Sequence, residues 1–186
     1  EGLAGANYSM GSLSGIHNAH PDWKIIATET ASPSNSRGIY NTLSQYNKTG
    51  DYQCTAYDTN AVSWGNTARE SWWYTIKDDF VSGEFIWTGF DYIGEPTPWN
   101  GTGTGSVSND KLAVPNSSYF GVIDTAGFEK DSFYFYTSQW REDKKTLHIV
   151  PQSWNAEDLS ISGGKVPVYV LSLIHISEPT RRTPIS

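Results

Sequence analysis

Two short apolar runs and one longer periodic segment dominate the first half of the chain. Residues 24–28 (KIIAT) are apolar and β-branched, with Pro21 before them, which is typical of a strand buried on both faces. Residues 84–88 (EFIWT) have the same character and are followed by Gly89. Between them, residues 63–80 predict a helix, because apolar side chains recur every four positions. These positions are Ala68, Trp72, Ile76 and Phe80.

Capping residues and a second helical segment complete this pattern. Asn66 or Thr67 can cap the start of the first helix, and Gly83 lies beyond its end. Residues 131–140 predict another helix, with Asp131 near its start. The order strand, loop, helix, strand, loop, helix is typical of a parallel βα sheet.

Two loops that follow the predicted strands are unusually long, at residues 29–61 and 90–118. Long loops after strands, rather than before them, fit the carboxyl-terminal face of a (β/α)8 barrel, where active sites lie. The sequence therefore predicts an α/β fold in which residues 1–143 form part of a TIM barrel.

The carboxyl-terminal segments have a different pattern. Residues 146–150 and 166–170 alternate and are broken by Pro and Gly, which predicts that an antiparallel β domain starts within residues 144–170. Residues 171–186 change abruptly to apolar and then basic, and they resemble a translated sequencing adapter. We therefore expect a non-native tail there. The alternative is a short strand over residues 171–176 followed by a polar tail.

Charge and composition narrow the function classes. The 186 residues carry a formal net charge of −7, which disfavours nucleic acids and anionic membranes as partners. No apolar stretch approaches the roughly 18 residues of a membrane span. Aromatic residues make up 14% of the chain, which suits stacking against sugar rings and equally suits a packed core. The single cysteine, Cys54, excludes an intrachain disulfide.

Glu29 is the first candidate for chemistry. It directly follows the predicted strand 24–28 and precedes small residues, so its carboxylate projects from the rim of the sheet with room for a ligand. Glycoside hydrolysis needs two such carboxylates, about 5–5.5 Å apart when the anomeric configuration is retained. The alternative is a solvated glutamate at the end of a strand.

A second candidate group follows the predicted strand 84–88. The strand ends near Trp87, and three polar residues come next in one loop: Asp91, Tyr92 and Glu95. An aromatic platform beside carboxylates suits sugar recognition, because the sugar ring stacks on the indole while its hydroxyls bond to the carboxylates. The alternative is a Trp that caps the core above a surface turn.

Taken together, the motifs resemble glycoside hydrolase family 2, especially its bacterial exo-β-galactosidases, over about residues 7–170. The similar stretches occur in the family's order, and the ordered set is specific although each one alone is weak. They are ATETAS (27–32), SRG (36–38), SWG (63–65), ESW (70–72), GEFIWTGFDYIGEPTPW (83–99), SSYFGVIDTAGF (117–128), KDSFYFYTSQW (130–140) and the pair Trp154-Asn155.

The resemblance implies roles that the residues alone do not fix. It implies strands 6 to 8 of the barrel followed by the start of a β-sandwich, with Glu29 as the catalytic nucleophile at the end of strand 7. It implies that Trp87 lines the sugar subsite and that Tyr8, at the end of strand 6, hydrogen-bonds the nucleophile. Substrate hydroxyls are then expected to contact the remaining polar candidates: Asp91, Tyr92 and Glu95.

One departure from the family pattern matters. The family's acid/base glutamate lies in an Asn-Glu pair, and no Asn-Glu pair occurs in this chain. We therefore expect a piece of a retaining β-galactosidase that carries the nucleophile but is inactive by itself. The alternatives are a non-catalytic carbohydrate-binding protein, and a family 2 enzyme for another sugar, such as a β-glucuronidase or β-mannosidase.

Partners and cofactors follow from the same resemblance. The expected partner is a β-galactoside oligosaccharide or glycan, and the oligomeric state is open. No cofactor motif is evident, and the resemblance leaves Mg or Na in a longer parent protein open. The resemblance implies a bacterial source and fits an extracellular or cell-surface location, which the residues themselves do not assign.

Overall fold

The computed structural model describes residues 2–41, 43, 52–97, 115–154 and 165–173. Residues 98–114 of the second long loop and residues 174–186 of the predicted tail lie outside this range. The elements in chain order are β1 (Leu3–Asn7), a 3-10 turn η1 (Met10–Ser12), α1 (Leu13–Ala19), β2 (Lys24–Ala31), α2 (Ala68–Ile76), β3 (Val81–Trp87), α3 (Asp131–Trp140), β4 (Leu147–Val150) and β5 (Tyr169–Ser172).

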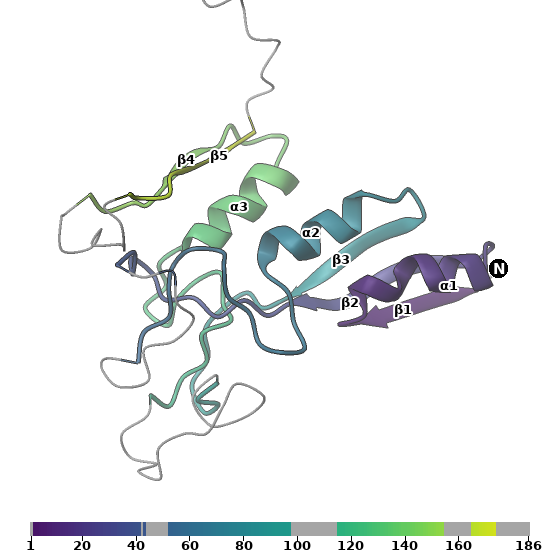
Figure 1. Ribbon diagram of the computed structural model, residues 1–186, viewed down its shortest axis with the longest axis horizontal. Coiled ribbons are helices and arrows are strands. Elements are labelled where there is room, and N and C mark those ends of the chain that lie inside the picture. Colours follow the sequence, from purple (N-terminus) through teal and green to yellow (C-terminus); the bar gives the residue numbers. More distant parts are fainter. Residues whose placement is uncertain (1, 42, 44–51, 98–114, 155–164, 174–186) are drawn as a thin grey trace, which may run out of the picture.

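Three parallel strands form the main sheet in the order β1-β2-β3 (Figure 1). Helices connect the neighbouring strands, as parallel pairing requires, because a parallel strand is reached only by a crossover. All three strands therefore end at one edge of the sheet, and the loops after β2 and β3 leave from that edge. The βα order predicted from the sequence is confirmed for these elements.

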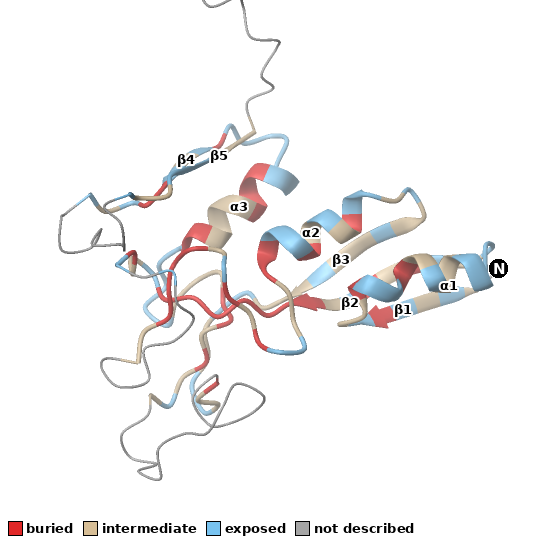
Figure 2. Ribbon diagram, viewed as in Figure 1, coloured by how far each residue is buried: buried red, intermediate tan, exposed pale blue. Residues whose placement is uncertain are grey.

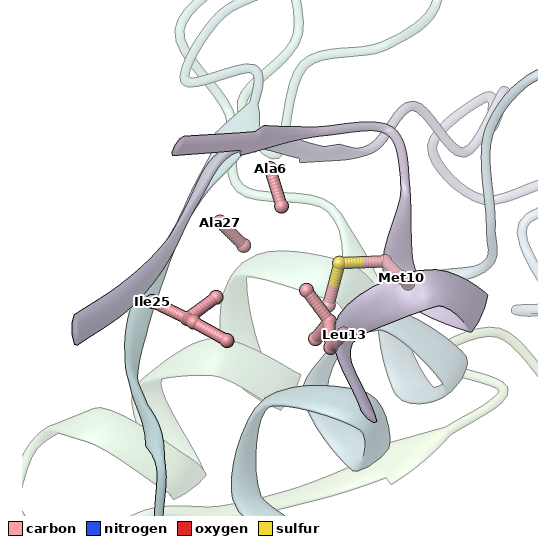
Figure 3. Close-up of a cluster of buried hydrophobic side chains, with 5 residues drawn as sticks. All are labelled: Ala6, Met10, Leu13, Ile25 and Ala27. Atoms are coloured by element: carbon pink, nitrogen blue, oxygen red, sulfur yellow. The ribbon is translucent and has the colours of Figure 1, made fainter. Parts of the chain in front are cut away.

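A small apolar cluster packs one face of the sheet (Figure 3). Ala6 on β1 and Ala27 on β2 bring little bulk, so the side chains of η1 and α1 approach the strands closely. Leu13 and Ile25 are fully buried, and burying each contributes about 1.5–3 kcal/mol. Met10 completes the cluster. This packing fixes β1 against β2.

Helix α2 is shorter than its sequence pattern predicts. It begins at Ala68 rather than at residue 63, because Thr67 closes a capping box with Glu70. Thr67 Oγ1 accepts a hydrogen bond from the Glu70 backbone, and the Glu70 side chain accepts one from the Thr67 backbone. The helix ends at Ile76, before the predicted end at residue 80. The prediction of Thr67 as a possible N-cap is confirmed.

The buried face of α2 also differs from the expected apolar stripe. Ser71 and Thr75 are buried together with Ala68, whereas Ile76 is 51% exposed. Ser71 Oγ accepts a hydrogen bond from the Ala31 backbone, and Thr75 Oγ1 donates one to Glu84 on β3. Polar contacts with the strands therefore decide which side of this helix faces the sheet.

The remaining boundaries follow the prediction more closely. Helix α3 spans residues 131–140 as expected. Strand β2 continues past residue 28 to Ala31, and β3 begins earlier than residue 84 and ends at Trp87. Residues 30–36 are all buried, so the first part of the loop after β2 runs inside the protein (Figure 2). This buried segment supports the candidate site.

A second, two-stranded sheet follows α3. Strands β4 and β5 pair antiparallel, with Leu147 opposite Ser172 and Val150 opposite Tyr169. Leu171 packs against the buried cluster that contains Tyr57 and Val150. The predicted start of the non-native tail, residue 171, therefore falls inside β5. Within the described ranges, no helix combines the length and apolar character needed to span a membrane.

Candidate active site

Glu29 lies in β2, two residues before the strand ends at Ala31. It is opposite Asn7 in the parallel register, and its carbonyl accepts a 2.8 Å hydrogen bond from the Tyr8 backbone. Its side chain is half-buried. The carboxylate is thus carried by a paired strand at the edge where the long loops begin, which is a rigid base for chemistry.

Tyr8 directly follows β1 and adopts a left-handed backbone conformation, with φ of 48°. Its hydroxyl lies 2.6 Å from Ser32 Oγ. Burial raises the pKa of Tyr8, and the Glu29 carboxylate adds to the rise both as a hydrogen-bond acceptor and as a negative charge. Tyr8 therefore keeps its proton at neutral pH and presents a hydrogen-bond donor beside Glu29.

Trp87 and Tyr92 form an aromatic pair at the end of β3. Their ring centroids are 6.1 Å apart with planes at 86°, an edge-to-face arrangement that is favourable for aromatic rings. Both residues are half-buried. Tyr92 also raises the pKa of Tyr8, because an ionised Tyr92 would repel an ionised Tyr8. The structure thus gathers Tyr8, Glu29, Trp87 and Tyr92 at one end of the sheet.

Glu95 holds Tyr92 in place. Tyr92 donates a 2.6 Å hydrogen bond to Glu95 Oε2, and Thr97 Oγ1 donates a 2.8 Å bond to Glu95 Oε1. Burial raises the pKa of Tyr92 to about 12, and the hydrogen bond to Glu95 contributes to that rise. Both Glu95 oxygens thus already have a protein donor, and the residue orients the aromatic pair. A contact between Glu95 and substrate stays a prediction.

Asp91 is directed into the protein rather than toward Glu29. Its Oδ2 lies 2.7 Å from Lys130 Nζ, and its Oδ1 accepts a 2.7 Å hydrogen bond from the Gly121 backbone. Its side chain is only 7% exposed. Burial raises the pKa of Asp91, and the Lys130 ammonium opposes that rise. As arranged, both oxygens of Asp91 brace the loops around the site, and a substrate contact for this residue stays a prediction.

Sequence reasoning did not identify Lys130 and Ser32. Lys130 also donates to the backbone carbonyls of Asn35 and Tyr119, so one buried ammonium joins three segments. A lysine just before a helix is usually a solvated residue, and no local signal distinguishes this one. Ser32 follows Glu29 in the ATETAS stretch, where small residues suggested only free space.

A partly open cavity of about 100 Å³ lies elsewhere, where α2, α3, β4 and β5 come together. It is largely apolar, and no predicted site residue lines it. Side chains such as Tyr57, Phe135, Val150 and Leu171 surround it. This cavity therefore lies apart from Glu29. In the described part of the chain, no three His, Cys, Asp or Glu side chains gather to hold a metal ion.

Two known proteins are similar to this chain in sequence. The chain is 38% identical over 164 residues to the β-galactosidase BoGH2A of Bacteroides ovatus, with 82% of this chain and 18% of that protein covered. It is 34% identical over 118 residues to a provisionally named β-glucuronidase of Formosa agariphila, with 62% and 10% covered. No protein-family model matches the chain.

A solved structure supports the same relationship. A β-glycosidase from Bacteroides vulgatus superposes with a TM-score of 0.63 at 25% identity, over 91% of this chain and 24% of that one. The chain spans 18% of the length of the B. ovatus relative and 10% of the F. agariphila relative. The similarity thus covers most of this chain and a limited part of each relative.

Proposed function

The chain belongs to glycoside hydrolase family 2, and on that premise we propose that it carries the nucleophile of a retaining β-glycosidase, Glu29. The observation that carries the proposal is the position of this carboxylate. It lies on a paired strand at the loop-bearing edge of the sheet, beside the Tyr8 hydroxyl and near the Trp87–Tyr92 pair. A carboxylate acceptor, a phenol donor and an aromatic platform together suit a pyranose ring.

The proposed reaction is a double displacement. An oxygen of Glu29 attacks the anomeric carbon, and the bond from that carbon to the leaving oxygen breaks while a second carboxylic acid protonates this oxygen. The same second group then takes a proton from water, whose oxygen attacks the anomeric carbon and releases Glu29. Two inversions at one carbon retain the configuration.

The second carboxylate is proposed to come from another part of the protein. No Asn-Glu pair of the family type occurs in this sequence. The carboxylates of Asp91 and Glu95 are already engaged by Lys130 and by Tyr92 and Thr97. We therefore propose that β1, β2 and β3 correspond to strands 6, 7 and 8 of a TIM barrel. The sandwich domain is proposed to begin within residues 144–170, and these 186 residues alone are expected to be inactive.

The proposed substrate is a terminal β-galactoside. Support comes from the relative named as a β-galactosidase, while the other curated relative carries the name of a β-glucuronidase. Glucuronidases of the family hold a sugar carboxylate with an Asn-x-Lys triplet, and one such triplet occurs here at residues 109–111. It lies outside the described residues. The sequence therefore does not argue against a glucuronide, and both sugars belong in the test.

A second candidate function is carbohydrate binding without catalysis. The edge-to-face pair of Trp87 and Tyr92 favours it, because an aromatic platform binds sugars without any nucleophile. The Glu29→Gln variant separates the two functions. A binding protein would keep its affinity, whereas a nucleophile cannot be replaced by an amide.

Covalent trapping tests the proposal directly. The intact protein, meaning the full native polypeptide that carries these residues, is treated with 2-deoxy-2-fluoro-β-galactosyl fluoride and digested for mass spectrometry. A label on Glu29 is the expected result. A label on another residue, or hydrolysis of galactosides without any label, contradicts the nucleophile assignment. The glucuronic-acid analogue of the reagent, used in parallel, identifies the sugar.

A further inference from the structure

A left-handed turn follows Glu29 closely. Ala31 and Ser32 both have φ of 64°, a conformation that costs an L-residue roughly 1–2 kcal/mol relative to glycine. Two consecutive non-glycine residues in this region persist only where the surroundings hold them. The turn is therefore held by contacts that can be identified.

Four residues hold the backbone of this turn. The Ala31 amide donates to Ser71 Oγ at 3.0 Å, and the Ala31 carbonyl accepts from the Asn66 amide at 2.8 Å. The Ser32 amide donates to the Trp87 carbonyl at 3.1 Å, and its carbonyl accepts from the Val62 amide at 3.3 Å. Every backbone polar group of the two residues is thus used, and the direction of the Ser32 side chain is fixed.

Close packing reinforces the turn. A Cβ on Gly65 would lie 2.3 Å from the Ala31 carbonyl oxygen, so only glycine permits this approach. Ser32 is 1% exposed, and its hydroxyl lies 2.6 Å from Tyr8 Oη. No solvent competes for this hydroxyl, so Tyr8 and Ser32 form one fixed pair.

The number of protons in this pair decides its direction. Tyr8 has a single hydroxyl proton, bonds to Ser32 Oγ and adjoins Glu29, whose carboxylate can only accept when ionised. Tyr8 can donate to Glu29 only if Ser32 donates to Tyr8. If Ser32 instead accepts from Tyr8, Glu29 loses its phenol donor.

We propose that Ser32 is a positioning residue that donates its hydroxyl proton to Tyr8 and so holds the Tyr8 hydroxyl in place beside Glu29. The inference rests on the proposed function of Glu29 as nucleophile and extends it to the group that orients its donor. Ser32 acts through Tyr8. Its removal should therefore change turnover more than substrate binding, and only while Tyr8 has its hydroxyl.

The test uses steady-state kinetics of the intact protein with nitrophenyl β-galactoside and β-glucuronide. Ser32→Gly removes the hydroxyl while easing the left-handed backbone, and Ala31→Gly eases the same backbone while keeping the hydroxyl. Ser32→Gly should lower kcat about tenfold, the size of one lost hydrogen bond, with KM changed less. Ala31→Gly should keep wild-type kcat. Tyr8→Phe combined with Ser32→Gly should be no slower than Tyr8→Phe alone.

The outcomes are distinct. Wild-type kcat in Ser32→Gly, or losses that multiply in the double variant, would overturn the positioning role while leaving Glu29 as nucleophile. Equal losses in Ala31→Gly and Ser32→Gly would also overturn it, because the backbone and not the hydroxyl would then matter. If the wild type hydrolyses neither substrate, or if Glu29→Gln keeps full turnover, the proposed function fails and the inference fails with it.

Discussion

Lys130 Nζ lies 2.7 Å from Asp91 Oδ2, with both side chains almost completely buried. The two residues lie near opposite ends of the long segment that connects β3 to α3, and Lys130 also donates to the Asn35 carbonyl in the loop after β2. Through Asp91 and Asn35, Lys130 therefore joins the loop that follows Trp87 to the loop that follows Glu29. Its energetic role is mainly to avoid a buried unpaired charge, because desolvation offsets much of the attraction between two buried ions.

Breaking this pair should destabilise the protein strongly. Lys130→Met leaves the Asp91 carboxylate buried without its cation, and we expect a loss of about 3–5 kcal/mol. Thermal unfolding of the intact protein would measure it. Lys77→Met is the matched control, because Lys77 pairs with Asp78 at a partly exposed position and should cost less than about 1 kcal/mol. Equal effects of the two variants would contradict the role of Lys130.

Gly121 should tolerate no side chain. A Cβ at this position would lie 2.0 Å from the Asp91 amide nitrogen and 2.6 Å from the Ile123 carbonyl oxygen, both of them backbone atoms. We expect Gly121→Ala to lower the unfolding temperature sharply or to prevent folding. A Cβ on Gly89 meets nothing within 4 Å, so Gly89→Ala is the control. A folded, wild-type-like Gly121→Ala protein would show that the two parts of the β3–α3 connection around Asp91 and Gly121 are not packed as described.

The capping box of α2 gives a smaller, local effect. Thr67→Ala removes the side-chain acceptor for the Glu70 amide, and we expect a loss of about 1 kcal/mol. Thr67→Ser keeps the hydroxyl and should stay close to wild type. Denaturant unfolding of the three proteins makes the comparison. A Ser variant as unstable as the Ala variant would mean that the methyl group, rather than the cap, stabilises this position.

Glu84 should make stability fall as the pH rises through its titration. Burial raises the pKa of Glu84, and hydrogen bonds from Thr30 and Thr75 oppose the rise. A folded pKa above the unfolded one means that the native state binds more protons between the two values. Its contribution is thus full below the unfolded pKa and is lost as the pH rises through the folded pKa.

Glu84→Gln tests this sign. The amide carbonyl can still accept from Thr30 and Thr75 but does not titrate, so the variant should lose this part of the pH dependence. Unfolding temperatures measured from pH 4 to pH 8 would show the difference between variant and wild type growing toward high pH. A constant difference across this range would contradict the assignment.

Trp87 should matter for sugar binding rather than for folding. It is half-buried at the end of β3 and packs edge-on against Tyr92. Under the proposed function, Trp87→Ala should weaken binding of galactose or a substrate analogue at least tenfold, through loss of stacking. Isothermal titration calorimetry on the Glu29→Gln background measures this without turnover. Trp73→Ala, on the exposed face of α2, is the control.

The sequence already contained the elements that carry the site. Apolar β-branched runs predicted β2 and β3, and the segment at residues 131–140 was identified as helix α3. Short-range patterns suffice to predict these elements, because the hydrophobic periodicity of a strand or helix is visible within its own residues. The position of Glu29 at the loop-bearing end of β2 follows from the same local pattern.

The tertiary structure decided which candidates face one another. Nothing near Asp91 in sequence indicates that its carboxylate turns toward Lys130, since this partner lies at the far end of the long segment that connects β3 to α3. The face of α2 that packs on the sheet was likewise set by tertiary contacts. Thr75 bonds to Glu84 and Ser71 bonds to the Ala31 backbone, so these polar residues face the sheet instead of the apolar Ile76. Buried polar groups must find partners wherever the fold brings them.

Local sequence therefore determined the strands, the helices and the position of the carboxylate. Only the folded chain determined that Tyr8 and Ser32 meet beside this carboxylate, because they follow different strands and each has a left-handed backbone. The physical reason is the range of the interactions. The hydrophobic periodicity that defines a strand or helix extends over a few neighbouring residues, whereas hydrogen bonds between loops depend on how whole elements pack.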